Sequence, residues 1–172
     1  MLDFAHWLAQ TRISLAIQTR LWVIPTVQSV HIVAIGIVMS SVFMMDLRVF
    51  GWAATDQTMR QMTRRFAPWL WGALCVLFVT GALMVVGEPV RELLSLSFWL
   101  KMSLIVVGAA TAAGFQMTLG RNDGDWEHSS ANRRTTKCLA MVTFLVWCGI
   151  VILGRLIAYD HVWGRWSLAP IT

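Results

Sequence analysis

Four long apolar segments separated by short polar connections dominate the sequence. A transmembrane helix needs about 20 mostly apolar residues, and each segment meets that length. The connections are too short to hold a soluble catalytic domain. The pattern therefore predicts an all-α integral membrane bundle of four transmembrane helices, built as one domain over 1–172, with spans at about 22–49, 68–87, 97–119 and 138–158.

The first 21 residues follow a different pattern. Polar side chains such as Asp3, His6 and Arg12 interrupt the apolar positions throughout. A secretory signal would instead show a pure apolar run followed by a small-residue cleavage site. Residues 1–21 are therefore expected to form an amphipathic helix that lies in the membrane interface.

The composition supports a membrane protein and argues against a nucleic-acid-binding one. Hydrophobic residues make up 57% of the chain and charged residues 13%. The net charge is +5, but the basic residues lie at the ends of the apolar segments and form no stripe with stacking aromatics. The lipid bilayer is therefore the expected surroundings, and no nucleic-acid partner is expected.

The basic residues also predict an orientation. The first and third connections are rich in Lys and Arg, whereas Arg91 in the second is offset by Glu88 and Glu92. Cytoplasmic loops collect Lys and Arg. The first and third connections are therefore expected to face the cytoplasm, with both termini facing outward.

This orientation places several polar or small residues at one depth. His31 would lie about two turns below the outer surface, given a rise of about 1.5 Å per residue. The antiparallel order of the spans brings residues of the other three helices to that level. The candidate set is His31, Gly81, Met84, Lys101, Met102, Gly154 and Arg155.

His31 is the most informative of these residues. Ionisable side chains within a span are costly, about 2.5–3.5 kcal/mol for Lys, Arg or Asp at the centre on insertion scales, and they usually face protein. Three interpretations stay open for His31. It could be a neutral histidine bonded to a neighbouring helix, a ligand of a metal or haem iron, or a proton-handling group.

Lys101, Arg155 and Asp46 have plainer interpretations beside functional ones. Lys101 and Arg155 could snorkel, with apolar stems in the hydrocarbon and charged heads at the interface. Arg155 could also pair with Asp160, Glu88 or Glu92. Asp46 is expected to find a basic partner in the first or third connection.

Small residues on the third span suggest close helix packing. Gly108 and Ala109 are each followed four residues later by alanine, at Ala112 and Ala113. Such spacing lets helices approach each other in lipid. We therefore expect a homo-oligomer, with this face as one route to assembly.

Several short segments occur in a distinctive order along the chain. They are PTVQSVH at 25–31, Asp46-Leu47-Arg48 followed by Gly51, Pro68-Trp69, Thr80-Gly81, Phe98-Trp99-Leu100-Lys101, and GRLIAY at 154–159.

This order, over about residues 20–160, resembles a bacterial family of small four-helix membrane proteins of unknown function. The resemblance implies four spans in the bacterial inner (cytoplasmic) membrane and draws attention to His31, Lys101 and Arg155. The family pattern has a histidine where this chain has Gln116. Gln116 lies near the inner end of its span, so that position and His31 could not hold one haem within a single bundle.

The first functional hypothesis is a small b-type cytochrome for electron transfer in the membrane. Haem iron is commonly held by histidine, with methionine or a second histidine opposite. His31 would ligate the iron of haem b, with Met84, Met102 or an open position opposite. Gly81 and Gly154 would give the macrocycle clearance, and Lys101 and Arg155 would meet the propionates.

Two other classes fit the sequence as well. The chain could be a cofactor-free transporter or channel-like oligomer, in which His31, Lys101 and Arg155 line an outward-facing cavity. It could also be a structural membrane subunit of a larger complex, with a membrane or periplasmic protein partner. Catalysis by this chain alone is the least favoured interpretation, since no catalytic motif is evident in the sequence.

Overall fold

The computed structural model describes residues 2–121 and 130–157, apart from the side chains of 115–121, 130–133 and 135. The described residues contain no strand, so the predicted all-α class is confirmed. The helices are α1 (Leu2–Ala9), α2 (Arg12–Gln18), α3 (Val23–Phe50), α4 (Met59–Gly87), α5 (Pro89–Leu93), α6 (Leu96–Arg121) and α8 (Ser130–Leu156).

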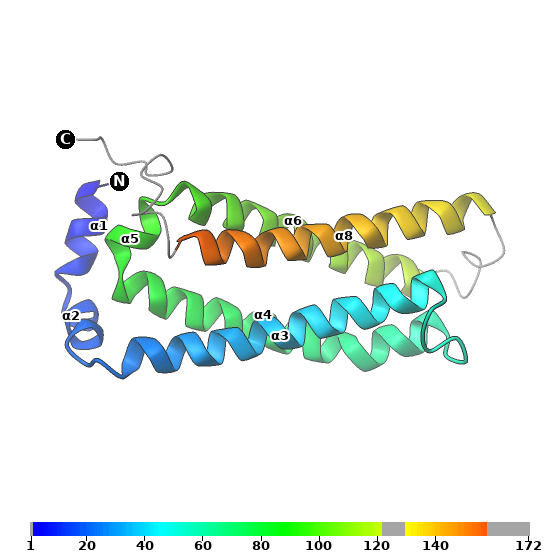
Figure 1. Cartoon of the computed structure of the whole chain (residues 1–172), viewed down its shortest axis with the longest axis horizontal. Helices are drawn as coiled ribbons and strands as arrows, with labels where there is room; N and C mark the ends of the chain where they lie inside the picture. Colours follow the sequence, from blue (N-terminus) through cyan, green and yellow to red (C-terminus); the bar gives the residue numbers. More distant parts are fainter. Residues whose placement is uncertain (1, 122–129, 158–172) are drawn as a thin grey trace.

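The four long helices form two antiparallel hairpins. α3 packs against α4 and α6 packs against α8, and the hairpins meet mainly where α3 lies against α8. Far fewer contacts join α4 to α6. Figure 1 shows α1, α2 and α5 gathered at one end of the bundle, which we call the capped end. The α3–α4 connection marks the opposite end, which we call the loop end.

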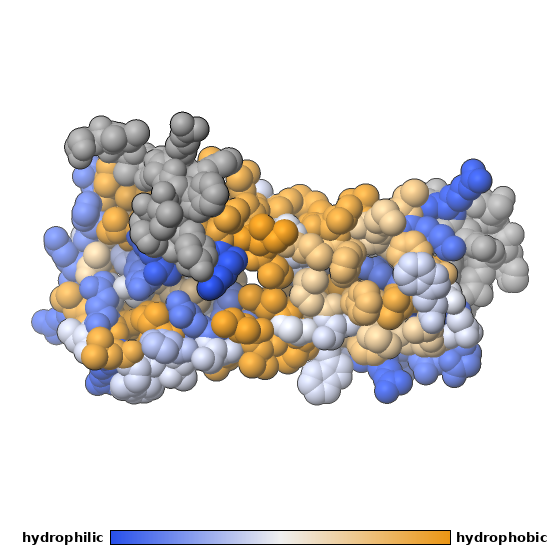
Figure 2. Space-filling view, in the orientation of Figure 1, coloured by the Kyte–Doolittle hydropathy of each residue, from blue (hydrophilic) through white to orange (hydrophobic). Residues whose placement is uncertain are grey.

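Each hairpin consists of two helices long and apolar enough to cross a membrane. The four candidate spans are Val23–Phe50, Met59–Gly87, Leu96–Gly114 and Thr136–Leu156. Figure 2 shows a broad hydrophobic band across the middle of the face in view, with hydrophilic residues gathered toward its two ends. This distribution is typical of a multi-pass membrane protein.

Local sequence explains where the first hairpin turns. α3 is capped by Gly51, the residue after Phe50, whose φ of 78° is left-handed and therefore favours glycine. α4 begins with a capping box, in which Thr58 and Gln61 bond each other's backbone N–H groups. This cap starts the helix at Met59, nine residues before the predicted span at 68, and leaves Pro68 inside it.

The N-terminal segment forms two short helices rather than the single helix expected. The break occurs at Thr11, whose hydroxyl donates to Leu8 O and accepts from Ser14 N–H. Ala5 and Ser14 are fully buried, and Ser14 Oγ donates to Val86 O of α4 at 2.7 Å. The segment therefore packs on the bundle as well as presenting exposed apolar side chains, including Phe4, Trp7, Ile13 and Leu15.

The small-residue face of α6 is used within the bundle. A Cβ added at Gly108 would lie 3.4 Å from the ring of Trp147 and 3.6 Å from Val146, both on α8. Ala112 packs against the same buried core. Gly108 thus allows α6 and α8 to approach each other. Assembly into a homo-oligomer remains an expectation, and it needs a surface other than Gly108.

Candidate functional site

A hydrogen bond between α3 and α4 positions the imidazole of His31. The His31 Nδ1 atom lies 2.7 Å from Thr80 Oγ1, and the Thr80 hydroxyl itself donates to Val76 O at 2.7 Å. Thr80 is buried and His31 is half-buried. A threonine hydroxyl carries a single hydrogen, so a hydroxyl that donates to Val76 O must accept from the His31 ring.

This bond selects one tautomer of His31. If Nδ1 carries the proton that it donates to Thr80, the lone pair of the neutral ring lies on Nε2. The same arrangement orients histidines that bind metals, since the non-ligating N–H is usually held by a second protein group. His31 is therefore arranged to offer Nε2 as a ligand or as a proton acceptor.

Gly81 gives the His31 ring its space. A Cβ added at Gly81 would lie 3.7 Å from His31 Cε1, which is ordinary contact distance. The imidazole thus packs over the Gly81 backbone, one residue beyond the threonine that bonds it. Thr80 and Gly81 together position the His31 ring, and the bond from Thr80 to Val76 O favours the tautomer with its proton on Nδ1.

Lys101 occupies the corresponding place in the second hairpin. Its Cδ atom would lie 3.7 Å from a Cβ added at Gly154 of α8, so the stem packs over a glycine as the His31 ring does. Its ammonium group lies 5.4 Å from the centre of the Phe98 ring, a cation–π contact. Lys101 is half-buried and directed into protein.

A buried carboxylate completes this cluster. Glu92 of α5 is 4% exposed and interacts electrostatically with Lys101. Arg91 lies 3.6 Å from Glu92 and 2.6 Å from Glu88. Burial raises the pKa of the Glu92 carboxyl, and the charges of Lys101 and Arg91 oppose that shift only in part.

Electrostatics connect the two hairpins at the capped end. Lys101 interacts with Glu92 and also with His31. His31, Gly81, Lys101 and Gly154 therefore lie in one region, as helix rise and antiparallel order predict. We call His31, Thr80, Lys101 and Glu92 the polar cluster. Figure 2 shows the surface hollowed between the hairpins in this half of the molecule.

A family model covers nearly all of this architecture. The model of DUF6644, a family of unknown function, matches residues 7–160. The chain belongs to the DUF6644 family. No curated protein and no solved structure matches it.

Membership of DUF6644 establishes no activity, so the roles of the remaining candidates depend on geometry. Met84 is half-buried on α4, one turn beyond Gly81, whereas Met102 on α6 is 38% exposed. Met84 is accordingly better placed than Met102 to face the polar cluster. Arg155 lies in the last turn of α8, beside Gly154.

Two other positions lie outside the described part of this DUF6644 chain. One is Asp160, a candidate partner of Arg155, and the other is the side chain of Gln116.

Sequence reasoning named two members of the polar cluster without their roles, Glu92 only as a possible partner of Arg155 and Thr80 only within a short segment. Thr80 stands out only as part of the Thr80-Gly81 pair, and a threonine in an apolar span usually bonds its own helix. Glu92 is placed by the fold of α5, which begins at Pro89 and returns the chain toward α6. A proline that starts a short helix between two spans is the signal that could have found it.

Proposed function

We propose that this protein is a small membrane cytochrome that binds haem b at the polar cluster and transfers electrons, with His31 as an axial ligand. The observation that carries the proposal is the hydrogen-bond chain from His31 through Thr80 to Val76 O. It leaves Nε2 with a lone pair in a fixed direction, which a haem iron needs from its ligand.

The surrounding residues fit such a group in charge and chemistry. Lys101 and Arg155 are cations near the capped end, and haem propionates are anions that form charge-assisted bonds with such side chains. Met84 offers a thioether for the opposite axial position, which could equally stay open. When bound, haem supplies one-electron redox chemistry, and the chain supplies ligation, charge and exclusion of water.

Absorption spectroscopy tests the proposal directly. The full chain is produced with ample iron and haem precursor, purified in mild detergent and examined for a Soret band before and after reduction. We expect haem in the wild type and its loss in His31→Ala. His6→Ala is the matched control, since His6 is exposed on α1. Wild-type protein without a Soret band would refute the cytochrome function.

A second candidate function follows from the electrostatic contacts of Lys101. Lys101 interacts electrostatically with both His31 and Glu92. Proton uptake at one of these groups therefore changes the free energy of protonating the others. This coupling favours a cofactor-free transporter that moves protons or anions. Vesicles with reconstituted protein would then show a flux that depends on pH and is lost in His31→Ala. Haem-containing protein without flux would exclude it.

We also propose that both termini face outward in a bacterial inner membrane. The support is the bias of Lys and Arg toward the first and third connections. A reporter that is active only in the cytoplasm should be silent when fused to Thr172 and active when inserted at Asp56. Strong activity at Thr172 would reverse the topology.

A further inference from the structure

A small cavity lies inside the bundle toward the loop end, away from the polar cluster. Its volume is about 40 Å³, and residues of all four long helices line it. Asp46 lies 15 residues beyond His31 on α3, which corresponds to about 22 Å along the helix axis. The cavity is therefore a separate site.

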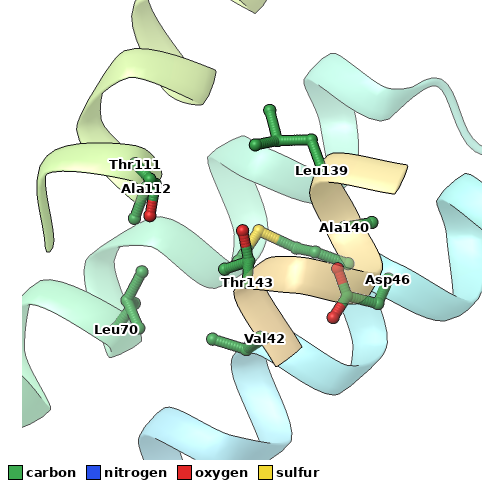
Figure 3. A pocket seen from close by; sticks show the side chains of 9 residues that line it. Val42, Asp46, Leu70, Thr111, Ala112, Leu139, Ala140 and Thr143 are labelled. Carbon is green, nitrogen blue, oxygen red and sulfur yellow. The ribbon is translucent and has the colours of Figure 1, made fainter. Parts of the chain in front are cut away.

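Asp46 places a carboxyl group at this cavity, and one oxygen of that group has no hydrogen-bond partner. This oxygen, Oδ2, is buried. Figure 3 shows the carboxyl group directed from α3 toward the space between α3, α6 and α8. An ionised carboxylate without partners in a membrane interior is strongly disfavoured, and such groups are kept neutral or are paired.

No counter-charge among the described side chains meets Asp46. A basic partner is expected from the first or third connection, and the side chains of Arg121 and Arg133 in the third lie outside the described part of the chain. From α4 the cavity is lined by Leu70, from α6 by Thr111 and Ala112, and from α8 by Leu139, Ala140 and Thr143. None of these side chains titrates. The nearby Arg48 is turned to the α3–α4 connection, where its Nε donates to Gln57 O.

The other polar groups at the cavity suit water and protons. Thr111 donates its hydroxyl hydrogen to Gly108 O, so its oxygen lone pairs stay available as acceptors. Thr143 adds a second hydroxyl. One turn further along α8, Trp147 Nε1 is another buried polar atom without a partner. A buried water needs about 10–15 Å³ of cavity volume and two to four polar partners. The cavity of about 40 Å³ therefore has room for about three water molecules.

We propose that Asp46 is a proton-binding group in a hydrated chamber near the loop end of the bundle, where it carries a proton at neutral pH and exchanges it with water. The ligand class is the proton, held on the carboxyl group and shared with water and threonine hydroxyls. Asp46 lies four residues before Phe50, the last residue of α3, or about 6 Å along the axis. The loop-end membrane surface is therefore the side from which we expect protons to reach it.

Infrared spectroscopy of the full-length protein in lipid tests this assignment. A protonated carboxylic acid has a carbonyl stretching band that is well separated from the carboxylate bands and moves in heavy water. All proteins compared carry Glu92→Gln, because Glu92 is a second buried carboxyl whose own band would overlap. We expect the band at neutral pH when Asp46 is present and its loss in Asp46→Asn. Asp56→Asn is the matched control, because Asp56 is exposed at the same end of the molecule and its substitution should leave the band intact.

A second pair of variants tests the chamber itself. Thr143→Val keeps the shape of the side chain and removes its hydroxyl, so it should shift the Asp46 band. Thr26→Val should leave it unchanged, since Thr26 is exposed at the capped end and bonds Trp22 O. Two results would overturn the proposal: a band that persists in Asp46→Asn, or an Asp46 band that appears only when sodium is removed, which would indicate a cation site.

Discussion

His31 Nδ1 and Thr80 Oγ1 lie 2.7 Å apart, and this bond joins the two helices of the first hairpin across 49 positions of sequence. The backbone groups here already bond within their own helices. The His31–Thr80 bond is therefore an additional, side-chain link between two spans. Such a bond contributes modestly to stability, about 0.6 kcal/mol on average between membrane helices. Its main consequence is therefore orientation of the imidazole.

The first prediction concerns this orientation. Thr80→Val keeps the side-chain volume and removes the acceptor for His31 Nδ1–H, so the ring should lose its single tautomer. Nitrogen chemical shifts of labelled histidine, measured by solid-state NMR, would report this change. If His31 holds a metal centre, affinity for it should fall by about 10–100-fold, the usual effect of removing such a supporting bond.

Thr80→Ser provides the control for that experiment. Serine keeps the hydroxyl and should retain both the bond and the tautomer. A single unchanged tautomer in Thr80→Val would contradict the role assigned to Thr80.

The second prediction follows from the burial of Glu92. Its pKa is raised in the folded protein, so its proton is bound more tightly in the folded state than in the unfolded one. The resulting stabilisation is fully present below the ordinary value of 4.5 and is lost as the pH rises through the folded-state pKa. Glu92→Gln should remove this part of the pH dependence.

Unfolding in mild detergent, followed across that pH range, is the measurement. Asp56→Asn serves as the control, because Asp56 is exposed at the loop end, far from Glu92. It should retain the wild-type dependence. If Glu92→Gln and wild type lost stability in parallel over this range, the assignment to Glu92 would be wrong.

The sequence predicts the parts of this molecule that follow from helix geometry. Long apolar runs locate the four spans, and the rise per residue brings His31, Gly81, Lys101 and Gly154 to one level. Both inferences need only the helical repeat and an antiparallel order. Neither depends on which way each helix is rotated about its axis.

The features that were missed depend on helix rotation and on tertiary docking. The rotation of α3 directs Asp46 between helices, while Arg48 two residues on turns to the α3–α4 connection. Glu92 becomes buried only because α5 folds against the capped end. The break at Thr11 is a local signal, since a threonine can accept from the N–H three residues on.

The third prediction concerns the close approach of α6 and α8. Gly108→Leu should destabilise the bundle, because even the first added carbon would contact the buried Trp147 ring at 3.4 Å. Overpacking of this kind costs about 1–3 kcal/mol. Thermal unfolding in detergent measures it, and Gly36→Leu is the matched control because a Cβ there meets nothing within 4 Å.

Size measurements on the same variants separate packing from assembly. Gly108 packs against α8 of its own chain, so the variant should lose stability whether or not the protein is an oligomer. A Gly108→Leu protein as stable as the wild type but reduced to a monomer would instead place this residue between subunits.

The fourth prediction concerns how the N-terminal helices are attached to the capped end. Ser14 is fully buried, donates to Val86 O at 2.7 Å and accepts from Gln18 Nε2 at 2.8 Å. Ser14→Ala removes both bonds and takes the hydroxyl donor away from Val86 O, and leaving such a group unsatisfied costs about 1–3 kcal/mol. The expected result is release of α1 and α2 rather than unfolding of the spans, since the four long helices keep their own contacts.

Hydrogen exchange of the full-length protein in lipid measures this release. Backbone amides of α1 and α2 should exchange faster in Ser14→Ala, while those of α3 and α4 keep their protection. Ser29→Ala is the matched control, because Ser29 is exposed and its hydroxyl bonds Pro25 O of its own helix. Unchanged exchange in α1 and α2 would show that apolar contacts hold these helices on the bundle without Ser14. The fully buried Ala5 makes such contacts.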